Sequence, residues 1–323
     1  GADNSRRVGQ VHAGVKRAGM VREVSLASRL RASGVSEVER AEKWLASDRL
    51  APLVKREDFW RDLAACAQPD QVLFCLMNLF EAVDSAKSLL GDKPQQLSLI
   101  IALCGLSRYC ADYLIAHPSL LEKLQVKSLQ SYWDGERYLV EQELAMVSRF
   151  RETAREYILR AVGAREIRED IWVATQGDLN DLRRAYRFQL LQIVAEDALH
   201  PDPLAFFSVV AAKLAALTDA TLEGALALSR SQYDSQGEVD FAVIALGKTG
   251  AGELNYHSDI DLIYVAEPAV CSNLGEDEAL RVASRLAIGI SAACCGPGIE
   301  MPLWPIDLAL RPEGQDGATC RTV

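Results

Sequence analysis

The sequence has few of the residues that build zinc sites. Its 323 residues include four histidines and eight cysteines, and no Cys-x-x-Cys pair occurs among them. These absences argue against a structural zinc site. Most of the cysteines stand among apolar neighbours, as in "LAACA" and "LFCLM". This setting indicates reduced core thiols and favours a cytoplasmic location.

A long uninterrupted apolar run is also lacking. The longest one, "LSLIIALCGL" at Leu97–Leu106, is too short to span a bilayer, so we expect no membrane partner. The basic residues near the start, such as Arg6 and Arg7, are not followed by an apolar stretch. The start is therefore not a signal peptide, and we expect residues 1–35 to form a flexible N-terminus.

Positive charge is not in excess either. Lysine and arginine number 35 against 45 aspartates and glutamates, for a formal net charge of −10. No broad basic surface is implied, so nucleic acid is not an expected partner. A hydrophobic content of 49% and the length of the chain indicate a globular protein with about two domains. An acidic protein that binds a nucleotide must supply local positive charge or metal ions.

Strand patterns are scarce in the first two thirds of the chain. The spacing of Ser36 and Glu39 predicts a capping box at the start of a helix. "DLNDLRRAYRFQLLQIVAEDAL" predicts an amphipathic helix with its arginines opposite the apolar face, ending before "HPDP". A long helix rich in alanine and leucine follows. We therefore expect residues 36–232 to form an all-helical domain.

The hydrophobic period changes at "SQYDSQGEVD", Ser231–Asp240, a polar and turn-forming stretch. After it, "FAVIALG" predicts a buried strand and "DIDLIYVAE" a second strand. "EDEALRVASRLAIGISAACCG" predicts a helix that ends at Gly296, and "MPLWPIDLALRPEG" contains a third strand. The fold class is thus expected to be α+β, a large all-helical N-terminal domain followed by a small α/β domain at residues 233–323.

Two of the predicted strands carry aspartates on one face. Because side chains alternate along a strand, Asp259 and Asp261 share a face, with Cα atoms about 6.5 Å apart. The same rule places Asp307 and Arg311 together on a later strand. Three carboxylates in one patch repel one another unless cations bind, and an oxygen-only ligand set suits Mg²⁺ or Mn²⁺. Two such ions, about 4 Å apart, can hold the attacking and leaving oxygens of a phosphoryl or nucleotidyl transfer.

A glycine-rich turn precedes these aspartates. Gly247 and Lys248 offer a close-approach backbone and a cation, and such a turn can cradle phosphate. The spacing matches neither a Walker A loop nor a dinucleotide-binding fingerprint. Ser258 either bonds phosphate or caps the turn. Arg311 either pairs with phosphate through two hydrogen bonds or forms a salt bridge to one of the aspartates.

Each of these features alone is weak, but together they resemble the DNA polymerase β-like nucleotidyltransferase superfamily. Its signature places Asp-x-Asp 9–13 residues after a glycine, with a later acidic residue, and here eleven residues separate Gly247 from Asp259. Lys248 departs from the serine usual in the superfamily. "ALGKTGAGELNYHSDIDLIYV" and "PIDLALRPEGQDGATCRT" resemble, within it, the glutamine synthetase adenylyltransferase/adenylyl-removing family.

The resemblance implies roles for seven residues. It implies that the catalytic metal ligands are Asp259, Asp261 and Asp307, and that Gly247, Lys248, Ser258 and Arg311 contact the nucleotide or phosphate. It also implies Mg²⁺ or Mn²⁺ as cofactor, ATP, ADP and phosphate as substrates or products, and glutamine synthetase and a PII-type signalling protein as partners.

The family enzyme has two such halves, one that removes AMP and one that adds it. "ELN" at Glu253–Asn255 resembles the N-terminal, adenylyl-removing half. The implied activity is therefore metal-dependent phosphorolysis of the adenylyl-tyrosine of glutamine synthetase, giving ADP, in the regulation of nitrogen assimilation. The alternatives are the forward adenylyltransferase reaction with ATP, or a regulatory docking module that binds a signalling protein.

Overall fold

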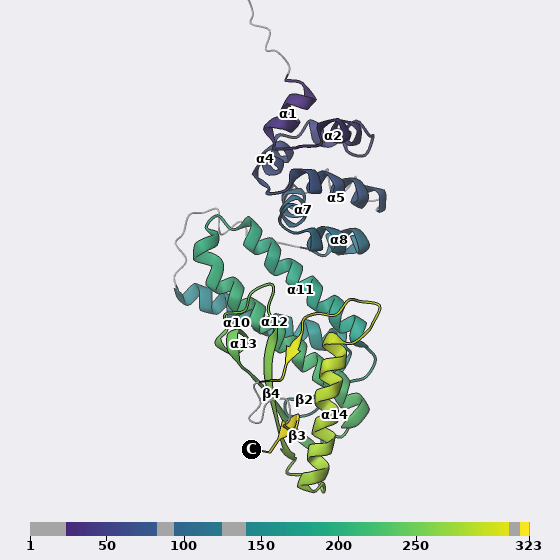
Figure 1. Cartoon of the computed structure of the whole chain (residues 1–323), viewed down its shortest axis with the longest axis vertical. Coiled ribbons are helices and arrows are strands. Elements are labelled where there is room, and N and C mark those ends of the chain that lie inside the picture. Colours follow the sequence, from purple (N-terminus) through teal and green to yellow (C-terminus); the bar gives the residue numbers. More distant parts are fainter. Residues whose placement is uncertain (1–23, 83–93, 125–139, 310–316, 323) are drawn as a thin grey trace, which may run out of the picture.

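The computed structural model describes residues 24–82, 94–124, 140–309 and 317–322, and it shows an α+β molecule rich in helices. The first helices stack at one end, the long helices α10, α11 and α12 lie in the middle, and the sheet lies at the other end (Figure 1). The helices before the sheet are α1 Leu26–Ala32, α2 Val38–Leu45, α3 Ala51–Val54, α4 Glu57–Ala65, α5 Pro69–Ala82, α7 Pro94–Leu106, α8 Arg108–Ala116, the 3₁₀ helix η1 Pro118–Glu122, α10 Val140–Ala161, α11 Leu179–Leu199 and α12 Pro203–Tyr233.

Helix α1 lies inside the segment predicted to be flexible. The side chain of Ser25 caps its first turn, and Leu30 is fully buried against the helices that follow. Residues 24–35 therefore contain a packed helix rather than flexible chain, because a buried leucine fixes it. Residues 1–23 lie outside the described part.

Two hydrophobic cores meet at α11. One is built from α1 to α8 and η1 and includes Leu191 and Val194 of α11. The other joins α10, α12 and the sheet and includes Leu182 and Ile193 of α11. The helix therefore buries side chains in two directions, and this second core runs without a break across the predicted boundary at residue 233.

Helix α12 is the apolar axis of the second core. By length and composition it could cross a membrane, but 67% of its most apolar stretch is buried inside the protein. It packs against α10, α11 and α14 (Glu276–Cys295), and it therefore occupies the place of a core helix.

The region expected to be all-helical contains a β-hairpin, so that expectation is wrong at this point. Strands β1 (Ala164–Arg168) and β2 (Ile171–Ala174) pair antiparallel, and Asp170 at their turn has a positive φ of 55°. The Arg168 guanidinium donates to the carbonyl of Gly237 at 3.1 Å and pairs with Asp240. The hairpin is thereby tied to the start of the main sheet, a contact between distant segments that local periodicity cannot reveal.

The main sheet is centred on β4 (Ile260–Pro268). Strand β3 (Val239–Ala245) pairs with it antiparallel, and β5 (Ile306–Asp307) and β6 (Cys320–Arg321) pair with it in parallel. Helix α14 covers the buried face of the sheet and ends at Cys295, with Gly296 as its C-cap, as predicted. Strand β3 is only partly buried, contrary to expectation, because it lies at the edge of the sheet.

Candidate active site

Three aspartates converge at one end of β4, as strand alternation predicted. One carboxylate oxygen from each of Asp259, Asp261 and Asp307 can be chosen so that all lie within 4.8 Å of one another. Asp261 is the direct parallel partner of Asp307, which places both side chains on one face of the sheet. Ile260 points into the core and is fully buried, so it fixes the outward direction of its two neighbours.

Backbone hydrogen bonds hold the strand ends that carry this triad. The Ile260 amide donates to the carbonyl of Pro305 at 3.0 Å, and the Leu246 amide donates to the carbonyl of Asp261 at 2.9 Å. The side chain of Asp307 accepts a hydrogen bond from the Ala309 amide at 2.7 Å. Two of the three carboxylates are half-buried and that of Asp259 is exposed, so the patch is held by the sheet but open to a ligand.

The donor set fits a hard divalent cation. Within the described ranges, no lysine, arginine or histidine forms a salt bridge with Asp259, Asp261 or Asp307. The ligand atoms on offer are carboxylate oxygens, which suit Mg²⁺ and Mn²⁺. Bringing three such groups together without a cation is electrostatically unfavourable, so the arrangement favours metal binding.

Gly247 lies directly beside this patch. It begins the short helix α13 (Gly247–Ala251), which ends at the left-handed Gly252, so the expected glycine turn is in fact one turn of helix between β3 and β4. Its φ is +55°, and a Cβ at this position would overlap Oδ2 of Asp261. Lys248 follows it with an exposed side chain, and its carbonyl accepts from the Glu253 amide at 2.8 Å.

The loop between α13 and β4 is shaped by its own side chains. Asn255 Oδ1 accepts from the His257 amide at 3.0 Å, and the Tyr256 hydroxyl donates to Asp197 of α11 at 2.8 Å. Burial, with the adjacent Asp197 charge, raises the pKa of Tyr256 far above its usual value, so the phenol stays protonated and remains a donor. The buried hydroxyl oxygen of Ser258 finds no hydrogen-bond partner within the described residues. It therefore makes no hydrogen bond that caps the turn, and its role towards phosphate stays a prediction.

Arg311 lies outside the described residues, so its expected place beside the aspartates is not tested. Two other arginines that the sequence placed on a solvent face are buried instead: Arg183 and Arg187 are 0% and 2% exposed. Arg183 donates to four backbone carbonyls, three at the end of α14 and one at Glu300. The i, i+4 spacing of the two arginines on α11 was visible in the sequence, but most of their carbonyl partners lie more than a hundred residues away.

Comparison with known proteins supports the assignment that the motifs suggested. Residues 97–323 match the family described as glutamate-ammonia ligase adenylyltransferase. A protein of Bifidobacterium longum subsp. infantis named bifunctional glutamine synthetase adenylyltransferase/adenylyl-removing enzyme is 34% identical over 271 residues, covering 81% of this chain and 24% of the relative. A Streptomyces avermitilis protein of the same name is 32% identical over 310 residues, covering 94% of this chain and 27% of the relative.

The chain thus spans about a quarter of the length of the curated relatives that it matches. The family match takes in the whole segment from α13 to β6, and with it all three aspartates. On the extent of this match, the chain belongs to the glutamate-ammonia ligase adenylyltransferase family.

Proposed function

We propose that this chain removes AMP from the adenylyl-tyrosine of glutamine synthetase by phosphorolysis and releases ADP. The observation that carries the proposal is the convergence of the Asp259, Asp261 and Asp307 carboxylates beside Gly247. Family membership and the names of the relatives supply the class of reaction and the protein substrate. The eight free cysteines suit a reducing compartment and support the proposed cytoplasmic location.

The reaction is a displacement at phosphorus. An oxygen of inorganic phosphate attacks the α-phosphorus, the bond from that phosphorus to the tyrosine oxygen breaks, and the tyrosine oxygen takes up the proton that the attacking phosphate gives up. The triad would hold a divalent cation, which would neutralise the charge that develops on the transferring group. Lys248 adds a positive charge next to Gly247, and the unpartnered Ser258 hydroxyl can donate to a phosphate oxygen.

The loop before β4 supports removal rather than addition. Asn255 stands where the sequence resembles the adenylyl-removing half, and its side chain accepts a hydrogen bond from the His257 amide. A residue without a side-chain acceptor could not make that bond, so Asn255 helps to hold the loop that leads to Asp259. We propose that this loop shape distinguishes the removing site from an adding one.

The direct test is to incubate the chain with adenylylated glutamine synthetase, Mg²⁺ and phosphate, and to identify the nucleotide product. ADP that appears only when phosphate is present is the expected result. Modification of the unadenylylated enzyme with ATP, releasing pyrophosphate, would instead assign the forward reaction. If neither occurs, the removal proposal fails, and binding to a PII-type protein would test the docking alternative. The double substitution Asp259→Asn and Asp261→Asn is the inactive control.

A further inference from the structure

We propose that Arg187 is a positioning residue for the aspartate triad, because it fixes the segment that leads into β5 and thereby the place of Asp307. This inference rests on the proposed function, since it takes the triad as the metal site. It assigns to α11, which lies outside the sheet, a role in shaping the site.

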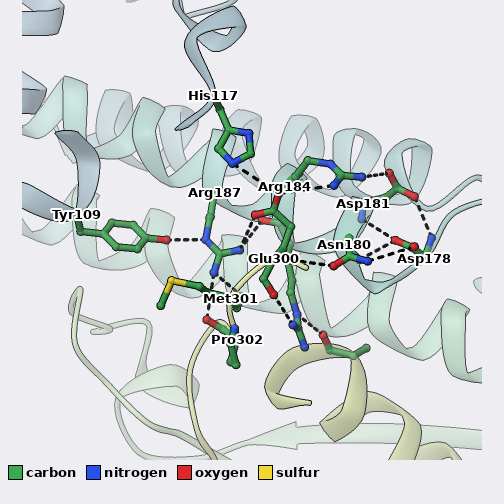
Figure 2. Close-up of polar contacts among 12 residues, drawn as sticks. Tyr109, His117, Asp178, Asn180, Asp181, Arg184, Arg187, Glu300, Met301 and Pro302 are labelled. Atoms are coloured by element: carbon green, nitrogen blue, oxygen red, sulfur yellow. Dashed lines mark hydrogen bonds and ion pairs between the residues drawn. The ribbon is translucent and has the colours of Figure 1, made fainter. Parts of the chain in front are cut away.

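Arg187 joins three separate parts of the chain through one buried guanidinium. Its Nη2 donates to the carbonyls of Met301 and Pro302, at 2.5 and 3.1 Å, and its Nε donates to the hydroxyl of Tyr109 on α8 at 2.6 Å (Figure 2). Charged donors form strong hydrogen bonds to carbonyls, and burial excludes the water that would compete for them. The path of the chain at 301–302 is therefore set by α11.

The neighbouring Glu300 is held by the same cluster. Its buried carboxylate lies 3.6 Å from each of Arg187, Arg184 and His117, and its amide donates to Asn180 Oδ1 at 2.9 Å (Figure 2). A buried carboxylate is costly unless it is paired, so these contacts favour one position for the segment.

The residues between Pro302 and Asp307 are also held in place by contacts with the rest of the fold. The Leu303 amide donates to the carbonyl of Cys294 at 2.9 Å, and Trp304 is buried with its ring edge against Tyr186. The carbonyl of the next residue, at 305, accepts from the first residue of β4. A shift of the segment at Pro302 would therefore move β5 along β4 and draw Asp307 out of register with Asp261.

Arg183 and Arg187 bind different parts of the chain, so the positioning role of Arg187 can be tested separately. Arg183 bonds the end of α14 and the Glu300 carbonyl, so its loss would disturb the helix itself. Arg187 pairs with the Glu300 carboxylate and donates to the carbonyls of Met301 and Pro302, which lie closer to the aspartate along the chain. Arg187 also links that loop to α8 through Tyr109, so the N-terminal helices contribute to the position of the loop that leads to the site.

The test is the affinity of the metal-free chain for Mn²⁺, followed by electron paramagnetic resonance, with Asp307→Asn to assign the binding to the triad. We expect Arg187→Met to weaken binding about 10-fold, the lower end of the range for residues that orient metal ligands through others. Hydrogen exchange of the segment 303–309, measured without metal, should become faster. Arg187→Lys, which keeps one cationic donor, and Tyr109→Phe should both fall between the parent and Arg187→Met.

The matched control is Arg160→Met, which removes an exposed arginine paired with Glu156 on α10 and should change neither readout. If folded Arg187→Met keeps the parent Mn²⁺ affinity and exchange rates, the inference is overturned. If that variant fails to fold, the same two measurements are made on Tyr109→Phe and on the charge-balanced double variant Arg187→Met with Glu300→Gln. Parent values of Mn²⁺ affinity and exchange in both variants would overturn the inference. If the parent chain does not bind Mn²⁺, the proposed metal site and this inference both fail. If the parent binds Mn²⁺ and Arg187→Met binds it equally well, only this inference fails.

Discussion

Gly247 packs directly against the carboxylate of Asp261. A Cβ at position 247 would lie 3.4 Å from Cγ of Asp261 and would overlap its Oδ2. The backbone there has a φ of +55°, and Gly252 at the other end of α13 has a φ of +72° with nothing within 4 Å of its Cβ position. Both glycines have a positive φ, but only Gly247 has a side chain against its Cβ position. Alanine substitutions at the two positions therefore separate backbone strain from the clash with Asp261.

We expect Gly247→Ala to lower the rate of adenylyl transfer at least about 10-fold, because the new methyl group must displace a triad carboxylate. Gly252→Ala should keep the parent rate. Both should lose about 1–2 kcal/mol of stability, the cost of an alanine in the left-handed region. Denaturant unfolding and the phosphorolysis assay check the two effects separately. An equal loss of activity in both variants would show that backbone strain alone matters.

The second prediction concerns Arg183. Its guanidinium bonds four carbonyls, at 2.7 to 3.2 Å, that include those at the end of α14. Burial lowers the pKa of this guanidinium, and its carbonyl acceptors offset the cost of burying it. Arg183→Met should destabilise the chain by about 3 kcal/mol, because buried carbonyls lose a charged donor that no water replaces.

Arg160→Met, on α10, is the control for Arg183. Arg160 is exposed and pairs with the exposed Glu156 at 2.8 Å, a contact of the surface type that contributes less than about 1 kcal/mol. Comparison of the urea midpoints of the two variants checks the prediction. Equal midpoints would mean that the buried arginine contributes no more than a surface one.

Asp70 provides the pH-dependent test. The predicted capping box at Ser36 does not form; instead the amide and hydroxyl of Ser36 and the amide of Glu37 donate to the Asp70 carboxylate at 2.7 to 3.0 Å. Partial burial acts to raise the pKa of Asp70, but these hydrogen bonds outweigh it and the pKa is lowered. Its contribution to stability is therefore complete above the ordinary aspartate pKa and is lost as pH falls through the lowered one.

Asp70→Asn should accordingly cost about 1 kcal/mol at pH 7, and the gap from the parent should close below about pH 4. Unfolding free energies of the two proteins, measured by urea denaturation from pH 3 to pH 7, check this. Asp48→Asn, at an exposed position between α2 and α3, is the control and should show no such convergence. A gap that stays constant with pH would refute the role of the carboxylate charge.

The triad was accessible from the sequence because it depends on local rules. Alternation along a strand fixes which side chains share a face, and the buried Ile260 confirms the direction of Asp259 and Asp261. Placing Asp307 beside them needed only the expectation that its strand joins the same sheet. The parallel pairing of Asp261 with Asp307 confirms it.

The buried arginines were not accessible in the same way. An arginine on an amphipathic helix indicates a solvent face unless a partner is known, and the partners of Arg183 are carbonyls at the end of a helix far along the chain. The hairpin of β1 and β2 was missed for a related reason. It is short, and its Arg168 is held by Gly237 and Asp240, which belong to another part of the fold.

The last prediction separates catalysis from stability at the triad. Replacing Asp259 and Asp261 by Asn keeps side-chain size and hydrogen-bonding capacity and removes two negative charges. In the metal-free chain those charges repel each other and Asp307, and within the described ranges no lysine, arginine or histidine forms a salt bridge with them, so the melting temperature should stay level or rise slightly. Activity should vanish, because the carboxylates are the proposed ligands of the ion that stabilises the transferring phosphoryl group.

Added Mg²⁺ should change the melting temperature of the parent but not that of the double Asn variant. An ion that binds the folded parent and not the unfolded chain must raise the parent's melting temperature, whereas the double Asn variant should show no rise. Thermal melts with and without Mg²⁺, paired with the phosphorolysis assay, measure both effects. If the aspartates had only a structural role, as caps or salt-bridge partners, the double substitution would lower the melting temperature and leave the catalytic rate unchanged. A double variant that turns over at the parent rate would therefore remove the basis for a nucleotidyl-transfer site on this sheet.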